Sequence, residues 1–283
     1  MTRNQQSLSQ TQVKLSFIEA GSCTHVEGMI DPQSSHPLRV IRFPSSVAVI
    51  EHPSKGVILF DTGYSPRFFV ETRSFPESLY AKITPVTVDE STSVLGQLRA
   101  RGIAARDVTR VVLSHFHADH IAGLRDFTSA QFVYHQDAFS KLKNLGRLGR
   151  LRAGFLPGLL PADFEERSAS LNESRFTRYE SPLVGFERGC DLLLDGSLVV
   201  IPLPGHAAGH VGLLVRSDQG EKFLIADAAW SRRSIRENRM PFVATKLIMA
   251  DFEAYRETLG RLNRLSRERM DIDLVPCHCS ESV

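Results

Sequence analysis

The stretch that decides the fold is Ser114-His-Phe-His-Ala-Asp-His120, which places three histidines and one aspartate within seven residues. It directly follows the apolar run at residues 110–113, whose composition predicts a β-strand. If the chain stays extended here, His115 and His117 point to the same side, whereas Asp119 and His120 diverge unless a turn redirects them. The stretch therefore predicts a polar site at the end of a strand.

The composition narrows the class of protein. The 283 residues are 42% hydrophobic and 23% charged, which is enough to bury a large core. A formal net charge of +2 argues against a dedicated nucleic-acid binder. The polar start MTRNQQSLSQTQ lacks the apolar core of a secretory signal, and no apolar stretch is long enough to cross a bilayer. We therefore expect a cytoplasmic protein with neither a nucleic-acid nor a membrane partner.

The four cysteines are too few and too scattered for a disulfide framework in a chain of this length. Cys277 and Cys279 flank His278, and this spacing differs from that of a zinc knuckle. We interpret them as two buried thiols at the end of a strand.

Short apolar runs rich in β-branched residues alternate with turns along the whole chain. In the first half they predict strands at 46–50, 56–60, 110–113 and 131–134, and a helix at 89–101 that ends at Gly102. In the second half they predict a hairpin of 192–194 and 197–201, strands at 211–215, 222–226 and 273–275, and a helix at 251–270. Helices between groups of strands indicate a mixed α/β fold.

Residues 139–181 interrupt this alternation with leucines and basic residues, broken by glycines and prolines. One interpretation is a helical excursion on the surface with a solvated basic edge. The other is a cap over a substrate pocket, because inserts between motif-bearing strands often carry specificity. A helix lying on a membrane is less favoured, since glycines weaken it. We predict one domain over residues 1–283 with a cap insert at about 139–181.

The histidine cluster has the chemistry of a metal site. Imidazole nitrogen and carboxylate oxygen suit zinc, iron or manganese. Four ligands so close in sequence cannot all reach one ion, whereas two neighbouring ions relieve this conflict. Further ligand types follow other predicted strands, at the edge where open α/β sheets bind ligands; these are His206, Asp227 and His278. The sequence thus predicts a centre of two metal ions.

This ordered set resembles the ligands of the metallo-β-lactamase-fold hydrolases. The resemblance implies an αβ/βα four-layer sandwich with two divalent ions at one edge, zinc (Zn²⁺) being the first choice and iron or manganese remaining open. It implies that the first ion is held by His115, His117 and His206. It implies that the second is held by Asp119, His120 and His278, and that Asp227 bridges both. Asp61, in the turn Asp61-Thr-Gly63, is implied to support the metal loop from behind.

Among these hydrolases, the motifs at 61–63, 114–120 and 204–210 are most similar to those of the N-acyl homoserine lactonases. Those lactonases carry a tyrosine three residues after the bridging aspartate, where this chain has Trp230. An indole can donate a hydrogen bond but cannot accept a proton, so we expect Trp230 to line a larger or flatter apolar pocket. We interpret His210 as a supporting histidine, because the ligand set is complete without it.

The implied chemistry is hydrolysis. Two cations that share a water lower its pKa and produce a hydroxide that attacks a carbonyl carbon, while Asp119 is expected to shuttle a proton. The expected substrate is a lactone or other small ester-like molecule. Two alternatives remain: a phosphodiesterase or nuclease on the same site, and a binding or redox protein that retains metal, iron included. The sequence leaves the oligomeric state open, with a homodimer as one alternative.

Overall fold

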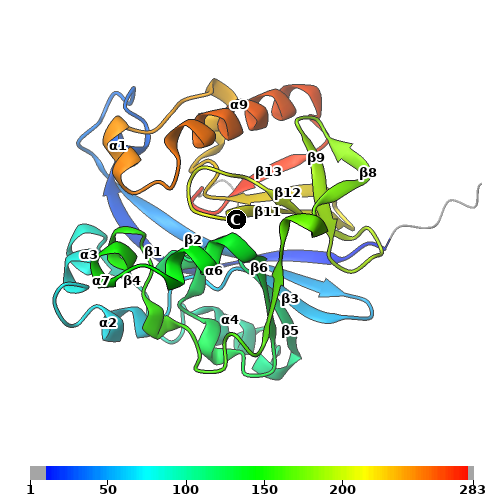
Figure 1. Ribbon diagram of the computed structural model, residues 1–283, viewed down its shortest axis with the longest axis horizontal. Helices are drawn as coiled ribbons and strands as arrows, with labels where there is room; N and C mark the ends of the chain where they lie inside the picture. Colours follow the sequence, from blue (N-terminus) through cyan, green and yellow to red (C-terminus); the bar gives the residue numbers. More distant parts are fainter. Residues whose placement is uncertain (1–10, 280–283) are drawn as a thin grey trace, which may run out of the picture.

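The computed structural model describes residues 11–279, which form two β-sheets packed face to face between helices (Figure 1). The first sheet has the order β4-β1-β2-β3-β5-β6-β7, formed by β1 (Lys14–Val26), β2 (Val40–His52), β3 (Gly56–Phe60), β4 (Val86–Thr87), β5 (Val108–Val112), β6 (Gln131–His135) and β7 (Ser168–Leu171). The second has the order β13-β12-β11-β10-β9-β8, formed by β8 (Thr177–Leu183), β9 (Phe186–Asp191), β10 (Leu198–Pro202), β11 (Val211–Ser217), β12 (Gly220–Ala226) and β13 (Asp273–Pro276).

The helices are mostly short. They are α1 (Glu27–Ile30), α2 (Arg67–Glu71), α3 (Ser78–Ile83), α4 (Val94–Ala100), α5 (Ala118–Ile121), α6 (Gln136–Lys143), α7 (Arg147–Arg152), α8 (Arg232–Glu237) and α9 (Phe252–Glu268). Single 3-10 turns are η1 (Ala105–Asp107), η2 (Leu124–Asp126), η3 (Pro157–Leu159), η4 (Glu173–Arg175) and η5 (Val243–Leu247). In the part of the chain that the structure describes, no helix is long and apolar enough to span a membrane.

Three layers of buried apolar side chains separate four layers of backbone. Alternate residues of one strand belong to different layers: Val49 packs against the helices of the first half, and its neighbour Ile50 packs between the sheets. In the second sheet, Val200 packs between the sheets and its neighbour Val199 packs towards α9. Strands buried on both faces must be apolar throughout, which explains the continuous apolar runs of the sequence. The predicted αβ/βα four-layer sandwich is confirmed.

The strand directions bring the ends of several strands to one edge. In the first sheet β3, β5, β6 and β7 run parallel, and in the second β13 runs parallel to β12 while the other pairs are antiparallel. Loops that follow β3, β5, β12 and β13 therefore leave the sheets on the same side. This placement determines where the site forms.

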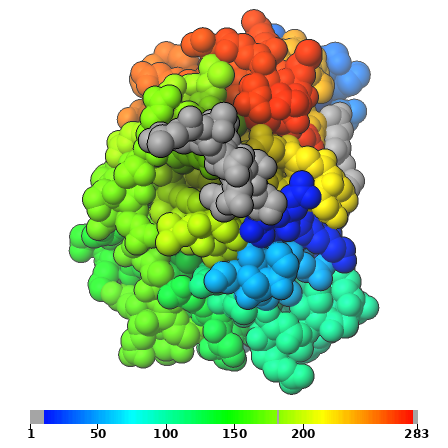
Figure 2. All heavy atoms as spheres, turned by 90° about the vertical axis from the view of Figure 1, so that its right-hand side faces the viewer, coloured from blue at the N-terminus to red at the C-terminus, as the bar shows by residue number. Residues whose placement is uncertain are grey.

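Backbone contacts at the start of the described chain also connect the two sheets. Val13 forms a bridge with Ser217, and its backbone exchanges hydrogen bonds with Arg216 at the end of β11 and Asp218 in the β11–β12 turn, at 3.1 and 3.0 Å. Figure 2 shows this face, where dark blue atoms from the beginning of β1 lie against yellow atoms of the turn. The first strand thus joins the first sheet while its start contacts the second.

Two element boundaries differ from the sequence prediction. The helix expected at 89–101 begins at Val94, because Ser93 caps it through Gly96 N–H and Asp89 folds the preceding residues into a turn around Thr92. The strand expected at 192–194 to form a hairpin with 197–201 is replaced by β9, which ends at Asp191 and pairs with β10. The carboxylate of Asp191 accepts hydrogen bonds from the backbone N–H groups that follow and holds them in the connection to β10.

The residues predicted as a cap, 139–181, do not form one appendage. Strand β7 extends the first sheet beside β6, and β8 starts the second sheet beside β9. Between β6 and β7 the chain forms α6, α7 and η3. The range 139–181 therefore combines this helical part and the turn η4 with strands of both sheets.

Candidate metal centre

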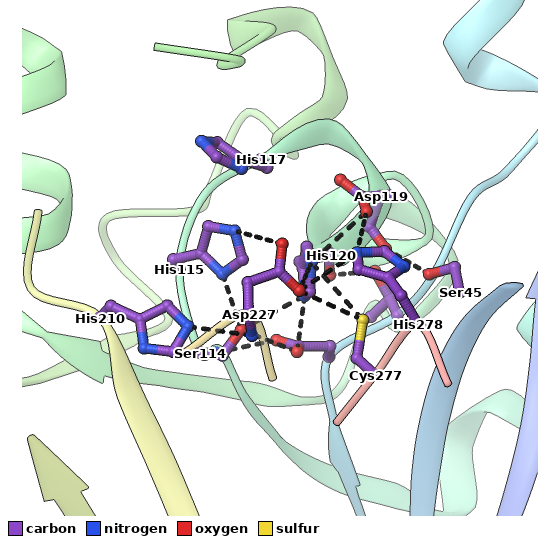
Figure 3. Close-up of polar contacts among 12 residues, drawn as sticks. Ser45, Ser114, His115, His117, Asp119, His120, His210, Asp227, Cys277 and His278 are labelled. Atoms are coloured by element: carbon purple, nitrogen blue, oxygen red, sulfur yellow. Dashed lines mark hydrogen bonds and ion pairs between the residues drawn. The ribbon is translucent and has the colours of Figure 1, made fainter. Parts of the chain in front are cut away.

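The predicted ligands come together at the edge where strands of both sheets end, and Figure 3 labels all of them except His206. His115 and His117 follow β5, Asp119 and His120 lie on the single turn of α5, His206 follows β10, Asp227 follows β12 and His278 follows β13. The turn of α5 directs the adjacent Asp119 and His120 to the same centre. All of these side chains except His117 are buried, and His117 is half-buried.

A first group of donor atoms is formed by His115, His117, His206 and Asp227, with one ligand atom from each lying within 4.8 Å of the others. His206 Nε2 lies 3.1 Å from His117 Nδ1 and 3.1 Å from Asp227 Oδ2, and His115 Nε2 lies 4.0 Å from the same carboxylate oxygen. Ligand atoms around a tetrahedral zinc ion lie about 3.3–3.6 Å apart, given bond lengths of about 2.0–2.2 Å. The spacing suits one cation.

A second group lies on the other oxygen of Asp227. His278 Nε2 is 3.1 Å and His120 Nε2 is 3.6 Å from Asp227 Oδ1. Asp119 Oδ2 lies 3.3 Å from His278 Nε2 and 3.4 Å from His120 Nε2. Since one carboxylate oxygen faces each group, Asp227 has the position of a bridge between two ions. The compact donor group here consists of His120, Asp227, Cys277 and His278. It includes Cys277, which was interpreted from the sequence only as a buried thiol, whereas Asp119 lies beside the group and is not one of its four members.

Polar partners behind the imidazoles set their orientation. His120 Nδ1 donates to Asp61 Oδ2 at 2.8 Å and His278 Nδ1 donates to the Pro44 carbonyl at 2.7 Å, while His115 Nδ1 lies 2.9 Å from Ser114 Oγ. A proton held on Nδ1 leaves the Nε2 lone pair of the same ring free to bind a cation. These contacts turn three Nε2 atoms towards Asp227.

Asp61 organises the loop as well as the imidazole. It occupies a left-handed backbone conformation, φ 65°, directly after β3, and its carboxylate accepts hydrogen bonds from the Ser114 backbone N–H and hydroxyl, both at 2.8 Å. Its side chain therefore connects the end of β3 to the first residue of the histidine stretch. That Asp61 supports a metal centre from this position stays a prediction.

Three further hydroxyl contacts were not anticipated from the sequence. Ser45 Oγ donates to the Asp119 carbonyl at 2.8 Å, and Thr62 Oγ1 donates to the His120 carbonyl at 2.9 Å and accepts from Gly123 N–H. They fix the backbone of α5, which is too short to be stable by itself. Thr62 belongs to the Asp-Thr-Gly turn and could have been inferred from it, whereas Ser45 carries no sequence signal.

The histidines of the centre differ in the direction in which their pKa values are shifted. Burial lowers the pKa of His115, and it lowers the pKa of His117 to about 3, so both rings are neutral at pH 7. Burial acts the same way on His120 and His278, but the neighbouring carboxylates, Asp119 for His120 and Asp227 for His278, outweigh it and hold both pKa values well above the usual range. The carboxylates thus stabilise positive charge on one side of the centre.

The donor set fits divalent metal ions. In the described residues, His115 Nε2 is buried without a hydrogen-bond partner while it faces the Asp227 carboxylate. An unpaired buried acceptor is costly unless something binds it. His117 Nδ1 and His206 Nε2 also face each other across 3.1 Å beside that carboxylate, which is the arrangement of ligands converging on one cation.

A cavity of about 350 Å³ opens beside His117 and His206. Its walls come from the loop after β5, from α6 and α7, and from the segment around η5; the apolar lining includes Phe116, Leu142, Leu145, Ala153, Ile248 and Met249. Arg152 Nε donates to the Leu247 carbonyl at 2.9 Å and links α7 to η5 at the cavity. The helical part of residues 139–181 therefore forms one wall.

Trp230 and His210 lie next to the centre in different ways. The Trp230 ring packs edge-on against His206, with ring centres 5.9 Å apart, and also contacts Phe43. It is not among the residues that line the cavity. His210 is outside both donor groups, and its Nε2 accepts a hydrogen bond from Asp227 N–H at 3.3 Å. His210 thus contacts the backbone of the bridging residue.

Comparison with known proteins agrees with the fold. A sequence model of the metallo-beta-lactamase superfamily matches residues 40–278. The chain is 24% identical over 263 residues to the N-acyl homoserine lactonase AiiB of Agrobacterium fabrum, covering 93% of this chain and 88% of the relative. It is 30% identical over 207 residues to the N-acyl homoserine lactonase AttM of Azorhizobium caulinodans, covering 70% of each.

Among solved structures, an N-acyl homoserine lactone hydrolase with the product N-hexanoyl-L-homoserine bound at its catalytic metal centre superposes with a TM-score of 0.70. The two chains are 18% identical, and the match covers 96% of this chain and 95% of that one. This likeness concerns the fold, and the family match extends over the whole site. The chain therefore belongs to the metallo-β-lactamase superfamily.

Proposed function

We propose that this protein hydrolyses a lactone or a similarly small ester-like molecule at a centre of two divalent cations, with zinc as the native metal. The observation that carries the proposal is the convergence of six side chains on a seventh, Asp227, beside an apolar cavity. The lactonase relatives support the choice of a cyclic ester.

The residues would hold the cations in two groups that share Asp227. His115, His117 and His206 would hold one, and Asp119, His120 and His278 would hold the other. Bound there, two cations would lower the pKa of a water between them and polarise a carbonyl oxygen. No serine or cysteine nucleophile is required for such a reaction.

Asp119 is the residue proposed to move the proton. Hydrolysis adds water across the acyl C–O bond, so the departing alkoxide oxygen must gain a proton that the attacking water has lost. Asp119 is 7% exposed and lies at the centre with its Oδ2 against His120 and His278. A carboxylate in this position can accept the proton from water and return it to the leaving oxygen.

The cavity beside His117 is proposed to hold the apolar part of the substrate. Its lining is dominated by aliphatic and aromatic side chains, which suits an acyl chain. We propose that α6 and α7 cover this part of the substrate, which limits the cap function to the helical part of 139–181. Trp230, edge-on to His206, is proposed to border the reacting end of the substrate rather than the acyl chain.

The experiment that tests the proposal is metal analysis of the purified protein, followed by turnover assays with lactones, thioesters, β-lactams and phosphodiesters. We expect two zinc ions per chain and the highest kcat/KM for a lactone with an apolar acyl chain. Higher kcat/KM for phosphodiesters, or a metal-loaded protein without hydrolysis of any ester, would overturn the proposal.

A further inference from the structure

Cys277 lies inside the donor group of the second cation. Its Sγ is 3.5 Å from Asp227 Oδ1 and 3.9 Å from His120 Nε2, and one donor atom from each of Cys277, His120, Asp227 and His278 lies within 4.8 Å of the others. Figure 3 shows the sulfur beneath the bridging carboxylate, on the side opposite Asp119. Neither the sequence pattern nor the family resemblance assigned this residue a role.

The backbone holds this thiol in place. Parallel pairing of β12 with β13 aligns Ala226 with Pro276, so Asp227 and Cys277 leave the sheet side by side. Cys277 N–H donates to the Ala226 carbonyl at 3.3 Å, and the Cys277 carbonyl accepts from Ser46 N–H at 3.1 Å. Because both backbone groups are hydrogen-bonded, the side chain has a defined direction towards the centre.

The distances are those of atoms that share one metal ion. A Zn–S bond of about 2.3 Å and Zn–N or Zn–O bonds of about 2.0–2.2 Å separate sulfur from its neighbouring ligand atoms by about 3.5–3.7 Å in a tetrahedral site. The separations of Sγ from Asp227 and His120, 3.5 and 3.9 Å, lie at or near this range. Cys277 is also only 6% exposed, so its thiol is protected from oxidants in solution.

The other thiols of the chain have different surroundings. Burial raises the pKa of Cys23 to about 11, and burial also raises the pKa of Cys190, so both stay protonated at neutral pH. Cys279, two residues beyond Cys277, is equally buried but belongs to neither donor group. Only Cys277, among the four, faces two imidazoles and a carboxylate in a common cluster.

We propose that Cys277 is a thiolate ligand of the second cation. The ligands of that cation would then be His120, Asp227, His278 and Cys277. Cys277 would take the place that the family resemblance gave to Asp119, whose carboxylate would be free to exchange a proton. As the metal–sulfur bond forms, the thiol S–H bond breaks and its proton passes to solvent. A soft thiolate favours zinc over manganese or magnesium at this position, because those hard ions prefer oxygen ligands. This inference rests on the metal centre of the proposed function and refines it.

X-ray absorption of the zinc-loaded protein tests the ligand directly. We expect a zinc–sulfur shell at about 2.3 Å in the wild-type protein and its loss in Cys277→Ser. Cys279→Ser is the matched control, because it removes a neighbouring buried thiol, and it should retain the shell. Cobalt substitution supplies a second readout: a thiolate-to-cobalt charge-transfer band in the near ultraviolet in the wild type and in Cys279→Ser, absent in Cys277→Ser.

The alternative role for Cys277 is a thiol that only donates a hydrogen bond to Asp227. In that case the loaded wild-type protein shows two bound ions without a sulfur shell or charge-transfer band, which overturns the ligand assignment and leaves the hydrolase proposal standing. Failure of the wild-type protein to bind either metal overturns both. Thermal unfolding of the metal-free variants identifies any variant that fails to fold, and the wild-type spectra decide the question without a variant.

Discussion

The variant Asp61→Asn tests whether Asp61 orients a ligand of the metal centre in addition to stabilising the fold. The Asp61 carboxylate is buried and accepts three hydrogen bonds of 2.8 Å, two from Ser114 and one from His120 Nδ1. Asparagine tolerates the left-handed backbone at this position and retains the acceptor for Ser114 N–H. Its amide NH₂ would replace the oxygen that faces His120, so the imidazole loses the acceptor that keeps its proton on Nδ1.

The magnitude follows from these contacts. Loss of a buried hydrogen bond to a charged acceptor costs about 2–3 kcal/mol of unfolding free energy. If the His120 proton moves to Nε2, that nitrogen can no longer bind a cation, and removal of such a supporting partner lowers metal affinity about 10–100-fold. We therefore expect a lower melting temperature of the metal-free protein and weaker zinc binding, measured by competition with a chromophoric chelator.

Asp195→Asn is a closely matched control. The Asp195 carboxylate likewise accepts from a serine backbone N–H and hydroxyl, those of Ser197, at 3.0 and 2.6 Å, and pairs with His52 Nε2 at 2.9 Å. This pair lies outside both donor groups. The control should lose stability without losing zinc affinity. Equal zinc affinities of wild-type, Asp61→Asn and Asp195→Asn proteins would refute the orienting role of Asp61.

Three other predictions concern the same centre. His117→Ala should remove bound metal and turnover, whereas His210→Ala should keep most of the metal; equal metal loss in both, measured by elemental analysis, would contradict the donor assignment. Gly154→Ala should lower kcat/KM at least about tenfold, because the added methyl would lie 2.7 Å from His117 Cδ2 at a φ of 62°; an unchanged rate with a normal melting temperature would count against a closely packed His117. Metal binding near pH 7 should release protons from His120 and His278, because their pKa values are raised, and metal affinity should therefore rise with pH. Calorimetry in buffers of different ionisation enthalpy measures the number of protons released. Metal binding without proton release would show that the charges assigned to these two histidines are wrong.

Much of the site was readable from local sequence. The 114–120 stretch contains four of the predicted ligands, and its position after an apolar strand places them at a sheet edge. His206, Asp227 and His278 also follow strands, so their convergence could be expected once the α/β class was recognised. Local patterns predict these positions because strands buried on both faces have a strong apolar signature in the sequence. Each predicted ligand lies in the segment that follows such a strand.

Other features depend on hydrogen bonds that the apolar pattern of the sequence does not reveal. The start of α4 at Val94 is set by the Ser93 cap and the turn at Asp89, which compete with the apolar periodicity that predicted an earlier start. The range 139–181 was predicted as one insert, but β7 and β8 obtain their hydrogen bonds from different sheets. Sequence alone does not identify which strand supplies those bonds.

The sequence by itself determined the class of fold, the metal-binding chemistry and the order of the donor residues, because these depend on residue type and on spacing along the chain. Only the tertiary structure decided that Asp227 faces two groups with its two oxygens, that the cavity opens beside His117, and that Cys277 joins the second group. The physical reason is the register between β12 and β13, which sets Cys277 next to Asp227 across 50 residues of chain. Such pairing results from the packing of whole sheets, and no short stretch of sequence encodes it.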